Sequence, residues 1–248
     1  MCTAAPATAE TYFEAAQKLY EAGKQTEARR ALRNELRIRP DNLEARYDLA
    51  VMLEETGHRK DAVALYEENL RRGWHLPTVV NLAAIYRQQG KIDRAVQLLE
   101  KAGRKFRHEA VPWYLLAEIS AAAGEKEKAK KQFEAALRAD PLNAFAHIRY
   151  AAFLAGQKQM RAAIRHARRG TGLRPECADC WRILGDILRD YGDHSDALKA
   201  YRKSAALNPD IIIRQRIITQ LHALGEHERA NVMQRSIEAL NRIRQSAP

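Results

Sequence analysis

The side chains best suited to chemistry lie together between residues 158 and 184. This stretch holds a Cys-x-x-Cys pair, Cys177 and Cys180, directly before Trp181. Two thiols at this spacing suit half of a zinc site or a thiol–disulfide couple. The same stretch is rich in arginine, with a closely spaced group at Arg161, Arg165, Arg168 and Arg169. Clustered arginines are typical of surfaces that bind phosphate groups or acidic proteins.

The cysteine pair has few partners for metal chemistry. A structural zinc site needs about four ligands, but the sequence has three cysteines and no second pair. The candidate histidine ligands, His147 and His166, are not at a motif spacing. A thioredoxin-type site needs a βαβ setting, which the sequence lacks. A helix N-terminus would still lower the pKa of a thiol, so Cys177 and Cys180 remain a candidate redox pair, with a local disulfide as one form. We predict no metal site.

Catalytic motifs are absent from the rest of the sequence. It has no phosphate-binding Gly-rich loop ending in Lys-Ser/Thr, no Gly-x-Ser-x-Gly and no His-Glu-x-x-His. The Gly-x-Gly at residues 170–172 follows a helical pattern, whereas a phosphate loop follows a strand. We therefore expect no catalytic residues, no cofactor and no enzymatic activity.

Composition favours a helical globular protein. The 248 residues are 46% apolar and 29% charged, and helix formers dominate. The net charge of +11 is uneven, because residues 1–124 carry 19 Lys and Arg against 17 Asp and Glu, and residues 125–248 carry 23 against 14. No apolar run is long enough to span a membrane, and no signal peptide is visible. A cytoplasmic location is the expectation.

A repeat of about 34 residues positions these side chains. Gly23, Gly57, Gly90 and Gly124 are spaced by 34, 33 and 34 residues, and Lys158 takes the next place. Gly192 and Gly225 continue the series, so seven units are predicted. Within each unit, two groups of apolar residues at helical spacing flank the glycine, and small residues recur where two helices would meet. Each unit is therefore predicted to be a helix, a tight turn and a second helix.

These residues resemble the tetratricopeptide repeat family. Residues 181–209, "WRILGDILRDYGDHSDALKAYRKSAALNP", match its Trp-x-x-Leu-Gly, Ala, Tyr and Pro pattern almost completely, and residues 113–141 do so as well. The resemblance implies an all-α fold, a right-handed α-solenoid in which each repeat packs on its neighbours. It covers nearly the whole chain, in units 9–42, 43–75, 76–109, 110–143, 144–177, 178–210 and 211–244.

The domain prediction follows from these units. Residues 1–8 form an N-terminal tail, residues 9–244 form one superhelix, and residues 245–248 form a short C-terminal tail. The last unit ends in a longer helix, from Glu226 to about Arg244, with an apolar stripe that suits a capping helix. The stripe is formed by Met233, Ile237, Leu240 and Ile243.

The resemblance implies that first helices line a concave groove that binds partner proteins. Mapping the family's groove positions onto this chain predicts a surface that is acidic at one end, apolar in the middle and mixed in charge at the other. Such a groove suits a segment of another protein, extended or helical. The predicted groove residues are Phe13, Tyr47, Val80, Tyr114, Phe145, Ile148, Arg182 and Asp186. The alternative is that the aromatic residues of this set only pack against neighbouring helices.

The leading expectation is therefore a non-catalytic scaffold that binds a protein or peptide partner and organises an assembly. In register, the four arginines of residues 161–169 lie on the outward side of a second helix, away from the groove. They are a solvated face or a docking site for an acidic protein, a membrane or nucleic acid; nucleic acid is disfavoured because no aromatic side chains interleave with the arginines. The sequence does not indicate an oligomeric state.

The N-terminus supports a second alternative. Cys2 precedes a stretch rich in Ala, Thr and Pro, and mature bacterial lipoproteins begin with a lipidated cysteine and a similar tether. On this hypothesis the protein is an envelope-assembly lipoprotein, periplasmic and anchored to the membrane at Cys2. The simpler interpretation is a cytosolic start with a free cysteine.

Overall fold

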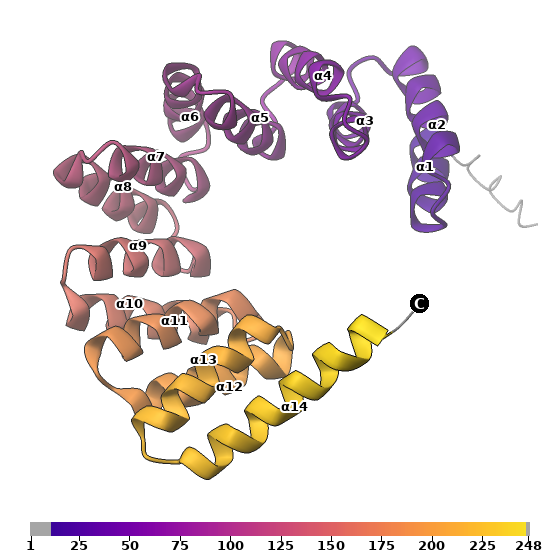
Figure 1. Ribbon diagram of the computed structural model, residues 1–248. Coiled ribbons are helices and arrows are strands. Elements are labelled where there is room, and N and C mark those ends of the chain that lie inside the picture. The colour runs from indigo at the N-terminus through magenta and orange to yellow at the C-terminus, as the bar shows by residue number, and fades with distance from the viewer. Residues whose placement is uncertain (1–10, 247–248) are drawn as a thin grey trace, which may run out of the picture. The chain divides into compact units, whose positions relative to one another are not determined.

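The computed structural model describes residues 11–246, and within them the fold is entirely helical. Fourteen α-helices follow one another as seven pairs, with no strand in the described range (Figure 1). The all-α class and the helix–turn–helix repeat predicted from the sequence are thus confirmed. Cys2 and the predicted N-terminal tail lie outside the described residues.

The helices divide between two compact units. The first unit ends at Phe106 and the second begins at Arg107. The first contains three helix pairs: α1 (Tyr12–Glu21) with α2 (Gln25–Ile38), α3 (Leu43–Glu55) with α4 (Arg59–Arg72), and α5 (Leu76–Gln88) with α6 (Ile92–Lys105). Within it each second helix also packs on the following first helix, α2 on α3 and α4 on α5.

The second unit contains four pairs and repeats this packing. They are α7 (Val111–Ala122) with α8 (Lys126–Ala139), α9 (Ala144–Gly156) with α10 (Met160–Leu173), α11 (Ala178–Tyr191) with α12 (His194–Leu207), and α13 (Ile211–Ala223) with α14 (His227–Ser246). The first helices also touch one another, α7 against α9 and α9 against α11. The last helix is the longest, with 20 residues, and it ends two residues beyond the predicted limit.

The turns inside six of the pairs are made by glycines with a left-handed backbone. Gly124 has φ +78° and Gly192 has φ +91°, and the other turn glycines have similar values. This region is open to glycine and disfavours side chains with a Cβ. The turn between α9 and α10 has Lys158 instead, with φ 62°. The 34-residue register, which places Lys158 among the glycines, therefore agrees with the backbone.

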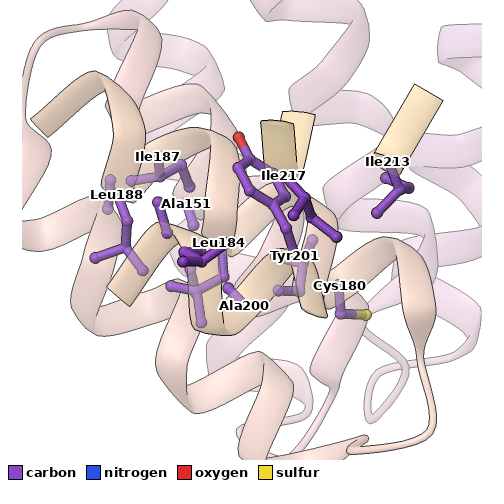
Figure 2. Close-up of a cluster of buried hydrophobic side chains, with 14 of the residues drawn as sticks. Ala151, Cys180, Leu184, Ile187, Leu188, Ala200, Tyr201, Ile213 and Ile217 are labelled. Atoms are coloured by element: carbon purple, nitrogen blue, oxygen red, sulfur yellow. The ribbon is translucent and has the colours of Figure 1, made fainter. Parts of the chain in front are cut away.

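Small residues let the two helices of each pair approach closely. The alanine that recurs in every second helix is fully buried in all seven repeats: Ala28, Ala62, Ala95, Ala129, Ala163, Ala197 and Ala230. In the second unit the core joins α9, α11, α12 and α13 through a cluster that includes Leu184, Tyr201 and Ile217 (Figure 2). Gly185 is required there, because a Cβ at this residue would lie 2.6 Å from the Tyr201 ring.

Candidate partner-binding surfaces

In the first unit, the predicted groove residues are half-buried side chains of first helices. Phe13, Tyr47 and Val80 come from α1, α3 and α5 and keep part of their surface exposed. Tyr47 is held from three directions. Its ring meets His75 edge-on, with centroids 5.0 Å apart, and lies 6.0 Å from the Tyr66 ring, and its hydroxyl accepts a hydrogen bond from Asn81 at 3.3 Å. Burial raises the pKa of Tyr47. The residue is a fixed aromatic surface rather than a mobile one.

A cavity lies beside Tyr47, between α1 and α3. Its volume is about 410 Å³, and we refer to it as the α1–α3 pocket. The floor is apolar, with Ala16, Leu32 and Met52. Its polar lining comes from Gln17, Tyr20, Glu21, Tyr47 and Asp48. The pocket therefore combines two phenol rings with two carboxylates on the first helices of adjacent repeats.

In the second unit, two of the three predicted apolar groove residues keep exposed surface. Tyr114 on α7 is half-buried. Phe145 on α9 is exposed, but the Arg174 guanidinium lies over its ring at 4.8 Å from the centroid, a cation–π contact within the same repeat.

The prediction that Ile148 lines a groove is wrong. Its side chain is 1% exposed and fills the space that Gly170 leaves open on α10. A Cβ at Gly170 would lie 2.6 Å from Cγ1 of Ile148. The helical frame placed Ile148 on the correct helix, but the glycine opposite draws it into the core.

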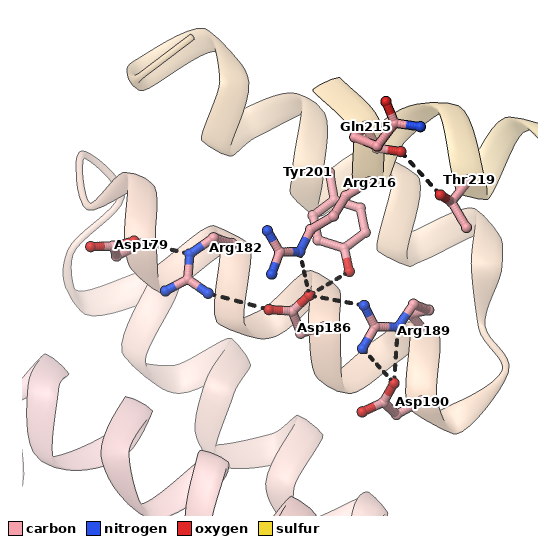
Figure 3. Close-up of polar contacts among 9 residues, drawn as sticks. All are labelled: Asp179, Arg182, Asp186, Arg189, Asp190, Tyr201, Gln215, Arg216 and Thr219. Atoms are coloured by element: carbon pink, nitrogen blue, oxygen red, sulfur yellow. Dashed lines mark hydrogen bonds and ion pairs between the residues drawn. The ribbon is translucent and has the colours of Figure 1, made fainter. Parts of the chain in front are cut away.

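The predicted Arg182 and Asp186 belong to a polar cluster that spans three helices (Figure 3). Oδ1 of Asp186 accepts hydrogen bonds from the Tyr201 hydroxyl at 2.8 Å and from Nε of Arg216 at 2.9 Å. Arg182 and Arg189, one helical turn to either side, each donate to Asp186 at 3.3 Å. Burial, and then the hydrogen bond to Asp186, raise the pKa of Tyr201 well above its usual value. We call these residues the Asp186 cluster.

The Asp186 cluster ties α11, α12 and α13 together. Asp179 pairs with Arg182 at 3.0 Å, and Asp190 pairs with Arg189 at 2.7 Å. The charges of its aspartates and arginines therefore compensate one another within the cluster. This compensation suits a structural role, and the outer edge of the cluster remains exposed. Arg216 was not predicted as a partner of Asp186, because this contact joins α13 to α11 across 30 residues of sequence.

The arginines of α10 lie on an exposed face. Arg161, Arg165 and Arg169 are exposed, as is Arg168. Arg168 pairs with Asp196 of α12 at 2.8 Å. One member of the predicted basic group is therefore committed to a contact between repeats, and three remain as a row on the outer side.

Two histidines, His147 and His166, form a pair between α9 and α10 that their positions in the sequence did not predict. Nδ1 of His147 and Nδ1 of His166 are 3.0 Å apart, across the α9–α10 interface. Burial, followed by the positive charges of His147 and Arg165, lowers the pKa of His166 to about 4. Neutral imidazoles can share one proton as donor and acceptor at this distance. Within residues 11–246 no set of three or more His, Cys, Asp and Glu side chains forms a metal-type cluster.

Cys177 and Cys180 are joined by a disulfide at the start of α11. The Cys177 sulfur accepts a hydrogen bond from the Cys180 N–H at 3.2 Å. Asn42 and Asn143 do the same at the starts of α3 and α9, towards Ala45 and Ala146. The cysteines thus occupy a helix-cap position and a buried alanine position of the repeat, and Cys180 is 1% exposed.

Comparisons with known proteins agree with this architecture. Models described as tetratricopeptide repeat match residues 13–77, 86–143 and 178–211. No curated protein matches the chain. The likeness to solved structures shows the fold alone, because sequence identity is low in each.

Two sets of solved structures illustrate that likeness. MamA is 20% identical with a TM-score of 0.57, over 66% of this chain and 97% of that chain. MamA 41-end from Desulfovibrio magneticus RS-1 is 21% identical with a TM-score of 0.57, over 68% and 96%. The APC/C hetero-tetramer Cut9–Hcn1 is 18% identical with a TM-score of 0.66, over 85% of this chain and 42% of that one. With seven helix pairs, left-handed turn residues and three family matches along its length, the chain belongs to the tetratricopeptide repeat family.

Proposed function

We propose that this protein is a non-catalytic scaffold that binds a segment of a partner protein on its first helices and organises a multiprotein assembly. The α1–α3 pocket carries the proposal, because it is a surface cavity lined by aromatic and charged side chains on the helices that line the groove in this family. Proteins built from these repeats generally act as protein-interaction scaffolds. One solved relative in fold, Cut9–Hcn1, is a hetero-tetramer.

Site-specific photocrosslinking in the native host tests the use of the first helices. A photoreactive amino acid replaces Tyr47 on α3 or Tyr114 on α7, both half-buried. The matched controls carry it at Lys60 on α4 or Lys131 on α8, which are exposed on second helices. We expect a discrete crosslinked partner from Tyr47 or Tyr114 and none from the two lysines.

Two results would count against the proposal. Crosslinks of equal yield from all four sites would mean unspecific contact, and crosslinks from the second helices alone would place the partner on the opposite side. As a second arm, a Tyr114→Ala, Phe145→Ala variant should capture less of the identified partner while keeping its helical circular dichroism spectrum, although its thermal midpoint falls because Tyr114 packs against the core. Unchanged capture would remove these two residues from the site.

A second function is proposed for the basic face. Arg161, Arg165 and Arg169 form the exposed row on α10, which supports binding to an anionic membrane surface or nucleic acid. Phosphate contacts weaken steeply as salt is added, because the release of counterions from the phosphates gains less free energy at higher salt. The loss amounts to orders of magnitude between about 50 and 200 mM salt when many contacts are made. Binding of the protein to anionic vesicles or single-stranded DNA should show this slope. Binding whose affinity does not change with salt concentration, or no binding at low salt, would exclude this second function.

The location is also a proposal, and two observations bear on it. None of the described helices is long and apolar enough to cross a membrane. The Cys177–Cys180 disulfide is the kind of bond that persists in oxidising compartments and is rare in the cytosol, so it supports the periplasmic alternative over the cytoplasmic one. Cell fractionation, with thiol alkylation before lysis, distinguishes the two: a disulfide found oxidised in the periplasmic fraction supports the alternative.

A further inference from the structure

Two neighbouring helices of the first unit, α2 and α3, carry opposite charge. The unit is basic in total, yet α3 is acidic, with Glu44, Asp48, Glu54 and Glu55. Its one arginine, Arg46, is buried. The neighbouring second helix, α2, carries the opposite excess, with Arg29, Arg30, Arg33 and Arg37 against Glu27 and Glu35. A basic protein that gathers carboxylates on one face favours cations at that face.

The α1–α3 pocket lies within this acidic face. Tyr20 and Glu21 enter it from α1, and Tyr47 and Asp48 enter it from α3. Beside it the Tyr20 hydroxyl donates to the Glu55 carboxylate at 3.2 Å. Phenol faces next to carboxylates are the two features that bind a guanidinium or ammonium group, through cation–π attraction and charge-assisted hydrogen bonds. The apolar floor accommodates the methylene stem of such a side chain.

The electrostatic surroundings of Asp48 point the same way. Burial, followed by the negative charge of Glu44, raises the pKa of this carboxyl, and only His75 opposes them. Glu44 is itself 3.1 Å from Nε2 of His75. Asp48 is therefore a half-buried carboxylate beside a like charge, an arrangement that a cation in the pocket would relieve.

We propose that the α1–α3 pocket receives an arginine or lysine side chain from a basic segment of a partner protein. This inference rests on the proposed function and specifies the partner's chemistry at one end of the first-helix surface. An acidic segment or a nucleic-acid phosphate would be repelled by Glu21, Asp48 and Glu55. A wholly apolar segment would leave the pocket carboxylates desolvated without a partner, which costs free energy.

Binding of short fluorescent peptides to the full-length protein tests the proposal. The probe is a fluorescein-labelled Ser-Arg-Leu-Ser-Arg peptide, measured by fluorescence anisotropy at moderate salt. Two versions of it serve as controls, one with citrulline and one with glutamate in place of each arginine. Citrulline keeps the shape of arginine without its charge. We expect the arginine peptide to bind at least about tenfold more tightly than either control.

A pair of matched variants locates the binding. Glu21→Gln with Asp48→Asn removes two charges from the pocket, and Glu27→Gln with Asp61→Asn removes two exposed carboxylates from the second helices α2 and α4. Both variants have the same net charge. We expect the pocket variant to lose about tenfold in affinity and the control to change by less than about twofold. Equal losses would mean attraction to the whole molecule and would overturn the proposal.

The peptide series also keeps this inference separable from the proposed function. If the wild-type protein binds the citrulline peptide as well as the arginine peptide, the pocket does not read charge, and the inference fails even if the pocket variant does not fold. If Tyr47 or Tyr114 crosslinks a partner while the arginine peptide does not bind, the inference fails and the scaffold function stands. If neither tyrosine crosslinks a partner and the arginine peptide does not bind, both proposals fail.

Discussion

Lys158 adopts a backbone conformation that the other turns leave to glycine. Its φ of 62° lies in the left-handed region, where a Cβ approaches the neighbouring carbonyl oxygen and costs about 1–2 kcal/mol. The N–H of Lys158 nevertheless bonds to the Ala155 carbonyl at 2.9 Å, which keeps the turn between α9 and α10 closed. The strain is local, and it is the price of replacing a turn glycine.

Replacing Lys158 by glycine should therefore stabilise the protein. We expect Lys158→Gly to raise the free energy of unfolding by about 1 kcal/mol, measured by urea titration. The reverse change provides the control: Gly124 has φ +78° and open space around a Cβ, so Gly124→Ala should lower stability by a similar amount through strain alone. A Lys158→Gly variant that is no more stable would show that the turn relaxes around lysine.

His166 makes the protein sensitive to acid. Its pKa is lowered from 6.5 to about 4 in the folded state, so as pH falls below 6.5 the unfolded chain binds a proton before the folded chain does. Stability is therefore unaffected above this range and is lost progressively as pH falls from 6.5 towards 4. Protonation of both His147 and His166 would also place two positive imidazoles side by side.

Thermal midpoints measured between about pH 7 and pH 4.5 check this effect. We expect the midpoint of the native protein to fall more steeply than that of His166→Gln, whose side chain does not titrate. His108→Gln, at an exposed histidine, should follow the native curve. Parallel curves for all three proteins would show that His166 protonates without cost in the folded state.

At the scale of the helices, the packing of α12 against α11 depends on Gly185. The Tyr201 ring occupies the space of the missing Cβ, at 2.6–3.0 Å from where that atom would lie. Tyr201 is fully buried, and its position is what brings the hydroxyl to Asp186. Five other repeats have alanine at the place of Gly185, so this glycine is specific to the repeat with the Asp186 cluster.

Alanine at Gly185 should therefore destabilise the protein, although it favours helix in general. We expect Gly185→Ala to lower the free energy of unfolding by about 1–3 kcal/mol, because the tyrosine ring must shift. Gly172 on α10 is the matched control, since nothing lies within 4 Å of a Cβ there. Gly172→Ala should instead stabilise the helix by about 0.5–1 kcal/mol. Urea titrations that give both changes the same sign would contradict the packing argument.

At the scale of the whole molecule, stability is distributed along the chain. Each described helix packs mainly on the helices next to it in sequence, and such stacks gain stability from neighbouring repeats rather than from one central core. Damage at one repeat should thus spread to its neighbours and fade with distance.

Hydrogen exchange of Gly185→Ala measures that spread. We expect amide protection to fall most in α11, α12 and α13, less in α7 and α8, and least in α1 and α2. The Gly172→Ala protein serves as the reference for the same readout. An equal loss of protection in all fourteen described helices would show that the chain unfolds as a single cooperative unit.

The repeat architecture could be predicted from the sequence because its signals are local. A glycine every 33 or 34 residues and apolar residues at helical spacing depend only on neighbouring positions along the chain. The same register placed Lys158 in a turn, Ala163 in a helix interface and Arg161 on an outward face. The Cys-x-x-Cys spacing at a helix start also predicted a possible redox pair at Cys177 and Cys180, which the structure joins in a disulfide.

The tertiary structure decided which of these side chains are available. Ile148 has the spacing of a groove residue, yet Gly170 on the facing helix leaves a space that buries it. The His147–His166 pair, the bond from Arg168 to Asp196 and the bond from Arg216 to Asp186 join residues 19 to 30 positions apart. Spacing along one helix assigns a side chain to a face, but its partner depends on the rotation and packing of the helix opposite, and those follow from the whole stack.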